Sequence, residues 1–145
     1  MPVARTRHGD FDYEEDQVLH VAGGLLGFPD ALRFLLLENA DVEPLRWLVS
    51  LDRPELTLLV IDPRLLVADF QIRLGEEDCE RLDLQEGDDS ALLPLAITVL
   101  AERGESSTAN LKAPVIVNTR RMRAAQIVLL DAPYSVQHPL LPRSA

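Results

Sequence analysis

Residues 46–61 read R-W-L-V-S-L-D-R-P-E-L-T-L-L-V-I, and this stretch decides the class of fold. It holds two apolar runs, 46–51 and 56–61, which are separated by the four residues D-R-P-E. Short apolar runs that end at residues such as Asp and Pro are typical of strands joined by a turn. The stretch therefore predicts an antiparallel hairpin.

The same pattern of short apolar runs continues on both sides of this hairpin. The predicted strands span residues 18–21, 34–37, 46–51, 56–61, 70–74, 96–100, 115–117 and 126–130. A short helix is predicted at 76–82 after Gly75, with Cys79 and Leu82 facing inward at i, i+3 spacing. We therefore expect a mostly β fold, a single-domain antiparallel barrel or sandwich-like sheet with one or two short helices.

The length of 145 residues suits one domain, and no repeat or shift in composition marks a second. We expect a single domain over 1–145, with 137–145 as a flexible tail. The longest mainly apolar stretch, 91–101, is interrupted by Pro94 and is shorter than the roughly 20 residues that a membrane span needs. Since no secretory signal is visible either, we expect a cytoplasmic protein. Cys79 is the only cysteine, which excludes an internal disulfide.

The net charge of −10 is concentrated in two segments. One contains Asp12, Glu14, Glu15 and Asp16, and the other, 76–89, carries eight acidic residues against Arg81. Such a surface repels phosphate backbones, which argues against direct binding of nucleic acid. Two interpretations remain open. The acidic segments are either solvated surfaces that maintain solubility or a patch that steers a basic protein partner toward this chain.

The sequence contains no pattern that is specific for catalysis. The glycines of G-G-L-L-G-F lack the lysine and the spacing of a phosphate-binding loop, so we interpret Gly23, Gly24 and Gly27 as turn residues. The histidines are far apart and match no ligand motif: His8, His20 and His138. We expect no enzymatic activity, no metal and no cofactor. The alternative is a small acidic enzyme or a ligand-binding β-barrel with a carboxylate-lined pocket.

Residues 107–118 read S-T-A-N-L-K-A-P-V-I-V-N. They predict a turn in which Asn110 satisfies backbone groups, an extended stretch stopped by Pro114, a buried strand, and a hairpin opened by Asn118. The segment resembles the T-x-N-L-x-A-P-I-x-I-N signature of the flagellar assembly factor FliW family. The matching positions are Asn110, Leu111, Ala113, Pro114 and Asn118. The segments G-G-L-L-G-F-P-D, R-F-L-L-L and L-R-W-L-V-S-L are similar to other parts of that family, in the same order.

The resemblance implies a cytoplasmic, non-enzymatic regulator of flagellar assembly and of translation. Proteins of the family bind flagellin and, when released from it, bind and antagonise the carbon storage regulator CsrA, an RNA-binding translational repressor. Because CsrA binds RNA, an acidic surface that repels RNA is physically suited to approach it.

Two surfaces are the candidates for partner binding. The first is the segment with Asp62, Pro63, Leu65, Leu66 and Phe70, because Pro63 stops a strand and is expected to leave an exposed sheet edge beside apolar residues. The alternative is that these apolar side chains fill the core. The second is the start of the acidic segment, with Glu76, Glu77, Asp78 and Glu80, which would act mainly on the association rate.

Overall fold

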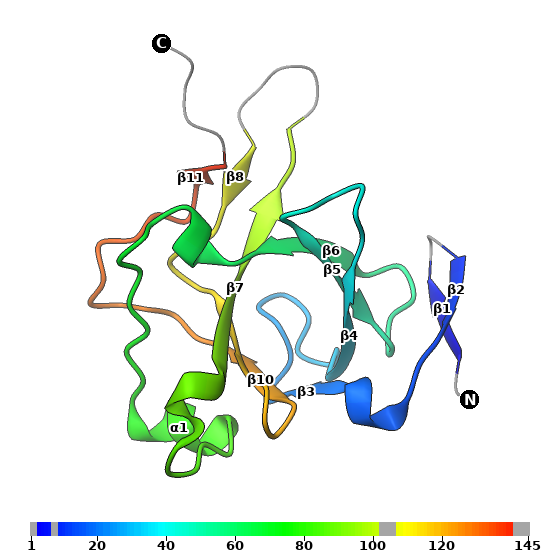
Figure 1. Ribbon diagram of the computed structural model, residues 1–145, viewed down its shortest axis with the longest axis horizontal. Helices are drawn as coiled ribbons and strands as arrows, with labels where there is room; N and C mark the ends of the chain where they lie inside the picture. The colour runs from blue at the N-terminus through cyan, green and yellow to red at the C-terminus, as the bar shows by residue number, and fades with distance from the viewer. Residues whose placement is uncertain (1–2, 7–8, 102–106, 141–145) are drawn as a thin grey trace.

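Seven strands of the described chain form a sheet that closes into a barrel (Figure 1). The structure, a computed structural model, describes residues 3–6, 9–101 and 107–140. The seven strands are β3 (Leu19–Val21), β4 (Arg33–Glu38), β5 (Arg46–Ser50), β6 (Thr57–Ile61), β7 (Leu92–Val99), β9 (Val115–Asn118) and β10 (Arg123–Gln126). Their order around the barrel is β7-β6-β5-β4-β3-β10-β9, and β9 pairs back with β7.

Neighbouring strands in the described barrel are antiparallel except for β3 and β10, where His20 lies opposite Arg123. Strand directions cannot alternate all the way round a closed ring with an odd number of strands. A barrel of seven strands therefore needs a parallel pair. The prediction of a mostly β barrel is confirmed, and the expectation that it is antiparallel throughout is corrected at this one pair.

Side chains from all seven strands meet inside the barrel in what we call the inner core. Its fully buried members include Leu19, Phe34, Leu48, Val60, Leu95, Val115 and Ala124. Because successive side chains in a strand point to opposite faces, the residues that alternate with these point out of the barrel. The inner core fills the barrel with packed apolar side chains.

A second cluster, the outer core, covers the outside of β6, β7, β9 and β10. Its buried members include Phe70, Leu82, Ala96, Ile116, Ala125, Ile127 and Leu129. The segments that follow β6 and β10 supply the covering residues, so both faces of β9 are buried. These two covering segments, 62–84 and 127–140, carry the surfaces considered below.

The hairpin predicted at 46–61 is confirmed as β5 and β6, which pair in antiparallel register. The Ser50 hydroxyl oxygen accepts hydrogen bonds from the backbone amides of Asp52 (3.2 Å) and Arg53 (2.9 Å) in the turn. The predicted helix is confirmed as α1 (Glu76–Arg81). Leu82 is fully buried at its end, and Cys79 is half-buried.

Two predicted strands are wrong. Residues 70–74 form no strand, and the Gln71 amide there donates to the Tyr134 hydroxyl at 2.9 Å and not to a backbone carbonyl. The strand predicted at 126–130 is β10, which starts earlier and ends at Gln126. Ile127 still donates to the Pro114 carbonyl at 3.0 Å, but Pro114 has no N–H to return, so the ladder weakens there.

The remaining elements lie outside the ring of seven strands. β8 (Thr108–Ala109) pairs with β7 and with β11 (His138–Pro139), while β1 (Val3–Thr6) and β2 (Gly9–Asp12) form a separate hairpin, on the right in Figure 1. The 3-10 helices are η1 (Glu15–Gln17), η2 (Pro63–Leu65) and η3 (Asp88–Ala91). The expected flexible tail, 137–145, thus includes β11, and its residues 141–145 lie outside the described residues.

The glycines before β4 are turn residues, as predicted. Gly23, Gly24 and Gly27 all have positive φ, at 76°, 69° and 87°. A Cβ atom at Gly24 would lie 2.7 Å from the backbone of Pro29, which is closer than side chains pack. This loop therefore requires glycine for both its conformation and its close backbone approach.

Candidate partner-binding surfaces

The first candidate surface, residues 62–70, is named here the proline segment. Asp62 begins η2, and its Oδ1 accepts a hydrogen bond from the Arg64 backbone amide at 2.9 Å. The Arg64 guanidinium donates to both Asp62 carboxylate oxygens, at 2.6 Å to Oδ2 and 3.0 Å to Oδ1, and this raises the pKa of Arg64. Pro63 is buried. The Asp62 carboxylate is thus occupied within its own turn.

The exposed sheet edge expected at Pro63 is absent from the described residues. β6 pairs with β5 on one side and with β7 on the other, where Ile61 lies opposite Ala96. Closure of the barrel removes the edge that a strand ending in proline could otherwise leave. This expectation was wrong because the second neighbour of β6 lies far along the chain.

The apolar residues of the proline segment divide between core and surface. The Phe70 ring is buried and stacks on Tyr134 with ring centroids 4.5 Å apart. Leu66 is half-buried and packs against the outer core. Leu65 is 63% exposed. The interpretation that these side chains fill the core therefore fits Phe70 and Leu66, and only Leu65 of the three is free to contact a partner.

The second candidate surface is the exposed side of α1, at the lower left of Figure 1. Glu76, Glu77 and Glu80 are exposed, whereas Asp78 is half-buried and its Oδ2 accepts a hydrogen bond from the Gly75 amide at 3.0 Å. Carboxylates in the first turn interact favourably with the N-terminal end of a helix. Glu76 and Glu77 thus stabilise the start of α1 and also present negative charge to solvent.

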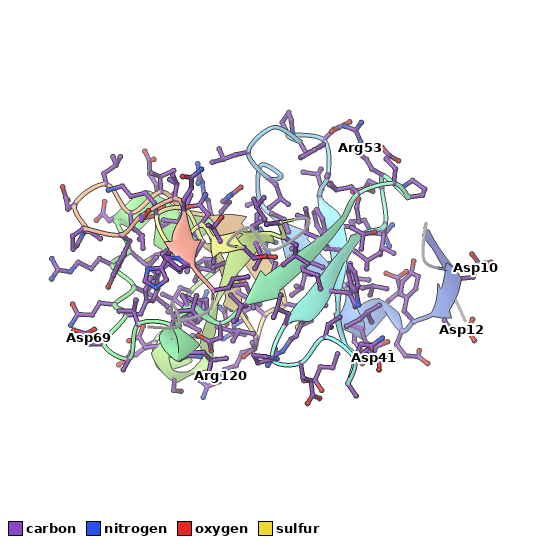
Figure 2. The ribbon with its side chains drawn as sticks, turned by 90° about the horizontal axis from the view of Figure 1, so that it is seen from above. Asp10, Asp12, Asp41, Arg53, Asp69 and Arg120 are labelled. Atoms are coloured by element: carbon purple, nitrogen blue, oxygen red, sulfur yellow. The ribbon has the colours of Figure 1, made fainter. Side chains whose placement is uncertain are left out.

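One acid of the segment 76–89 has a different role. The Asp88 carboxylate is buried beside the turn between β9 and β10, where it accepts hydrogen bonds from the Gln85 amide (3.0 Å), Asn118 Nδ2 (3.2 Å) and Arg121 Nε (3.2 Å). These bonds, led by that from Gln85, lower the pKa of Asp88 from 3.8 to about 2. Arg120 also contacts this carboxylate, at 3.4 Å, from the molecular surface (Figure 2).

The residues of the signature segment, 107–118, stabilise the fold and do not form a polar surface. Asn110 Oδ1 accepts hydrogen bonds from the backbone amides of Lys112 (3.1 Å) and Ala113 (3.0 Å), as the predicted turn requires. Asn118 is fully buried, donates to the Leu82 carbonyl at 3.1 Å and opens the β9–β10 hairpin. The other signature positions are buried: Leu111, Ala113 and Pro114.

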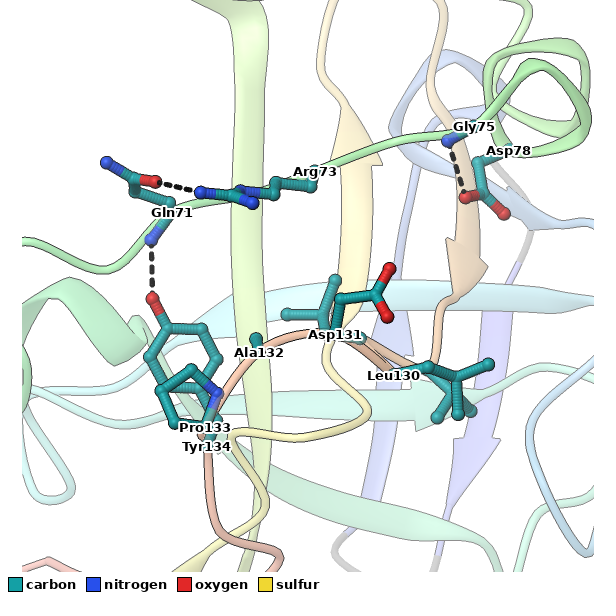
Figure 3. A pocket seen from close by; sticks show the side chains of 11 residues that line it. Gln71, Arg73, Gly75, Asp78, Leu130, Asp131, Ala132, Pro133 and Tyr134 are labelled. Atoms are coloured by element: carbon teal, nitrogen blue, oxygen red, sulfur yellow. Dashed lines mark hydrogen bonds between the residues drawn. The ribbon is translucent and has the colours of Figure 1, made fainter.

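A groove that the sequence did not predict lies between two segments that belong to no strand (Figure 3). Residues 71–75 form its N-terminal wall and residues 128–134 its C-terminal wall; Asp78 also lines it, and its volume is about 300 Å³. Figure 3 shows the Asp131 carboxylate in the space between the walls. The signal available in the sequence was the run V-L-L at 128–130, which is predicted as the end of a strand; Val128 and Leu130 are 44% and 78% exposed.

Two further features bear on the kind of site present. Within residues 3–6, 9–101 and 107–140, no group of three or more His, Cys, Asp or Glu side chains is placed to hold a metal ion. The same described residues include no helix with the length and apolar character of a membrane span. Residues from the two covering segments, 62–84 and 127–140, meet at the groove.

Comparison with known proteins gives a consistent result. The family model described as FliW protein matches residues 2–140. A flagellar assembly factor FliW of Geobacter sulfurreducens is 35% identical over 145 residues, covering 100% of this chain and 89% of that protein. Its counterpart from Bacillus subtilis is 33% identical over 133 residues, covering 92% of each chain. A crystal structure of the flagellar assembly factor FliW superposes with a TM-score of 0.86 at 26% identity, over 98% of both chains.

Proposed function

The chain belongs to the FliW family and acts in flagellar assembly, and from this premise we propose that it binds flagellin and antagonises the RNA-binding repressor CsrA. Flagellin would bind it in the cytoplasm, and release from flagellin would allow it to bind CsrA. The observation that carries the proposal is the family match over residues 2–140. The role of the family is regulatory rather than catalytic.

The charge distribution supports CsrA as a partner. A protein that binds RNA presents basic residues to phosphate groups. The exposed carboxylates of Glu76, Glu77 and Glu80 lie together on α1, and the chain as a whole carries a net charge of −10. Complementary potentials raise the rate of encounter between such partners and have a smaller effect on the lifetime of the complex.

The two proposed partners make the protein a switch. If flagellin and CsrA exclude each other, the amount of free flagellin determines how much of this protein is available to CsrA. The response then depends on the difference between two binding free energies and not on either affinity alone. Such a switch requires surfaces for recognition and no chemical transformation.

The direct test is a pull-down with the purified protein as bait. Flagellin and CsrA are offered separately and then together, each at micromolar concentration. The proposal expects that each is retained alone and that flagellin reduces retention of CsrA. Retention of neither partner would contradict the proposal, and simultaneous retention of both would contradict mutual exclusion.

The role of α1 is tested by charge reversal. In a variant with Glu77→Lys and Glu80→Lys, the association rate with CsrA should fall and should depend less on salt, because the steering potential is reduced. The matched control is Asp41→Lys with Glu43→Lys, which changes the net charge equally at exposed positions outside α1. Equal rates for the two variants would show that net charge, and not the α1 surface, governs association.

A further inference from the structure

A row of basic side chains crosses three neighbouring strands on the outside of the barrel (Figure 1). His20 in β3 lies opposite Arg33 in β4 on one side and opposite Arg123 in β10 on the other. Neighbouring strands lie about 4.8 Å apart, and side chains at matched positions share a face of the sheet. His20 and Arg123 are exposed, and the Arg33 side chain is 38% exposed. The three side chains therefore form one row that faces solvent.

The turn between β9 and β10 continues this row. Arg120 and Arg121 are exposed there, and both contact the buried Asp88 carboxylate, at 3.4 Å and 3.2 Å (Figure 2). Asp88 in turn accepts a hydrogen bond from Asn118, which lies opposite Arg123. Together the side chains of the row and the turn are named the basic band: Arg33, His20, Arg123, Arg121 and Arg120.

The basic band is a local excess of positive charge on an acidic protein. Its four arginines have two carboxylate partners among the described residues, Asp88 and Glu15, and Glu15 lies 3.5 Å from Arg33. The side chains of His20 and Arg123 have no ion pair or hydrogen bond within the described part of the chain. The chain carries a net charge of −10, yet its own carboxylates leave part of this band uncompensated.

The apolar clusters on the outside of the barrel end on either side of β3. The outer core reaches Ala125 in β10. A third cluster, formed by Tyr13, Val18 and Leu35, lies against β4. Within the part of the chain that the structure describes, neither cluster includes a residue of β3, whose outward residue is the exposed His20. This section of the sheet surface is therefore open to a partner.

A pocket of about 380 Å³ at one end of the barrel lies beside the basic band. Its charged lining residue is Asp16, in η1. The apolar side chains that line it belong to the inner core: Leu19, Leu36, Leu93, Val117 and Met122. Leu19 directly precedes His20, and Met122 stands between Arg121 and Arg123. The barrel-end pocket and the basic band are thus built from adjacent residues of the same segments.

Met122 connects the barrel-end pocket to the basic band and has an unusual backbone conformation. Its φ of 53° lies in the left-handed region, which glycine and asparagine adopt more readily than methionine. A methionine side chain is flexible and adapts its shape to the group that packs against it. The turn therefore holds an adaptable apolar side chain at the pocket, where backbone conformation alone would favour glycine.

We infer that the basic band and the barrel-end pocket together bind an acidic segment of a protein partner that carries one large apolar side chain. The apolar side chain fills the pocket, and carboxylates of the segment pair with the guanidinium groups of the band, whose fork geometry matches a carboxylate. This inference goes beyond the proposed function, which assigns no partner to this surface. Nucleic acid is a poorer occupant, because the band contains no aromatic side chain and the chain as a whole repels phosphate.

The probe is a fluorescent synthetic peptide of about eight residues in which a central Leu is flanked by Glu residues. Its length exceeds the row of three strands, which spans about 10 Å, or about three extended residues. Fluorescence anisotropy measures its binding to the full chain. Replacing Glu with Lys, or the central Leu with Ser, should weaken binding by at least about tenfold. Equal binding of the Lys peptide rejects the basic band, and equal binding of the Ser peptide rejects the pocket.

Variants of the protein locate the site. Arg123→Glu should weaken binding of the Leu and Glu peptide by at least about tenfold, because it reverses the charge of an unpaired arginine. Arg123→Gln removes the charge without reversing it and should have a smaller effect. The matched control is Arg73→Glu, which changes the net charge equally at an exposed position outside the band. Thermal unfolding confirms that each variant is folded. Equal affinity of Arg123→Glu and Arg73→Glu, or no binding to the unmodified chain, overturns the inference.

Two other occupants are distinguished by further measurements. A single-stranded oligonucleotide that binds the unmodified chain as tightly as the peptide, and is lost with Arg123→Glu, would make the band a nucleic-acid site and reject the inference. A dimer in sedimentation that dissociates both with Arg123→Glu and with Glu77→Lys and Glu80→Lys would assign the band to α1 of a second copy and also reject it. The peptide assay contains neither flagellin nor CsrA, so its result is independent of the proposed function.

Discussion

The proline segment and the C-terminal wall of the groove differ in a way that the sequence alone does not show. The proline segment follows a strand that ends at a proline, yet β6 is paired on both sides. The C-terminal wall follows β10 without a proline or glycine between them, yet the strand ends and the chain turns, with the Leu130 amide donating to the Val128 carbonyl at 3.1 Å. Strand pairing therefore depends on which segments meet when the barrel closes and not on whether a proline or glycine lies at the end of a strand.

The two regions are joined at Phe70, and the largest expected effect is there. Replacing Phe70 with Ala should lower the free energy of unfolding by about 3–5 kcal/mol, because it leaves a cavity in the outer core and removes the ring that Tyr134 stacks on. Chemical denaturation measures the loss. The control is Leu65→Ala, an exposed position in the same segment, where a change within about 0.5 kcal/mol is expected. A small loss at Phe70 would mean that the proline segment is not part of the core.

Asp88 links the chain after the proline segment to the turn before β10. Its contribution to the free energy of unfolding depends on pH. Its pKa is lowered from 3.8 to about 2 in the folded protein. The native state thus binds fewer protons than the unfolded state in this range, so the stabilisation is complete above pH 3.8 and is lost as pH falls toward 2.

The variant Asp88→Asn should therefore be less stable at neutral pH and should lose this part of the acid dependence, because an amide does not titrate. Thermal unfolding followed between pH 2 and pH 4 measures how steeply stability changes with pH. This range is set by the lowered pKa of Asp88 and its ordinary value. Asp89→Asn is the matched control, since that neighbouring carboxylate is exposed. Equal slopes in the unmodified chain and in Asp88→Asn would show that this carboxylate does not control acid stability.

The parts of the fold that local sequence determines were predicted correctly. Gly75 precedes α1, the D-R-P-E turn joins β5 to β6, and Asn110 satisfies backbone amides in its turn. Each of these depends on residues within a few positions of one another. The FliW family could likewise be identified from the segment that contains Asn110 and Asn118.

The parts of the fold that were predicted wrongly depend on contacts between segments that are distant in the sequence. The Phe70 ring stacks on Tyr134 within the outer core, and the Gln71 amide donates to the Tyr134 hydroxyl and not to a strand. Neither contact leaves a signal in the residues near position 70. The partners named at the sequence level and the residues assigned to them remain predictions, and the groove adds Leu130 and Asp131 to the positions to be tested.

A smaller effect is expected at Lys112, which acts only on the C-terminal wall. In Lys112→Met, the carbonyls of Leu130 and Ala132 lose their charged donor, and the free energy of unfolding should fall by about 1 kcal/mol. Hydrogen exchange should accelerate at residues 130–132 and remain unchanged in the proline segment. Lys112→Arg keeps a cationic donor and serves as the control. Faster exchange in both regions would mean that Lys112 stabilises the whole outer core.

The smallest effect on stability is expected for Leu65→Ser and Leu130→Ser, one in each region. Both side chains are largely exposed, at 63% and 78%, so each variant should unfold within about 0.5 kcal/mol of the unmodified chain. Thermal unfolding checks this. A loss of stability in Leu130→Ser alone would instead place that side chain in the fold.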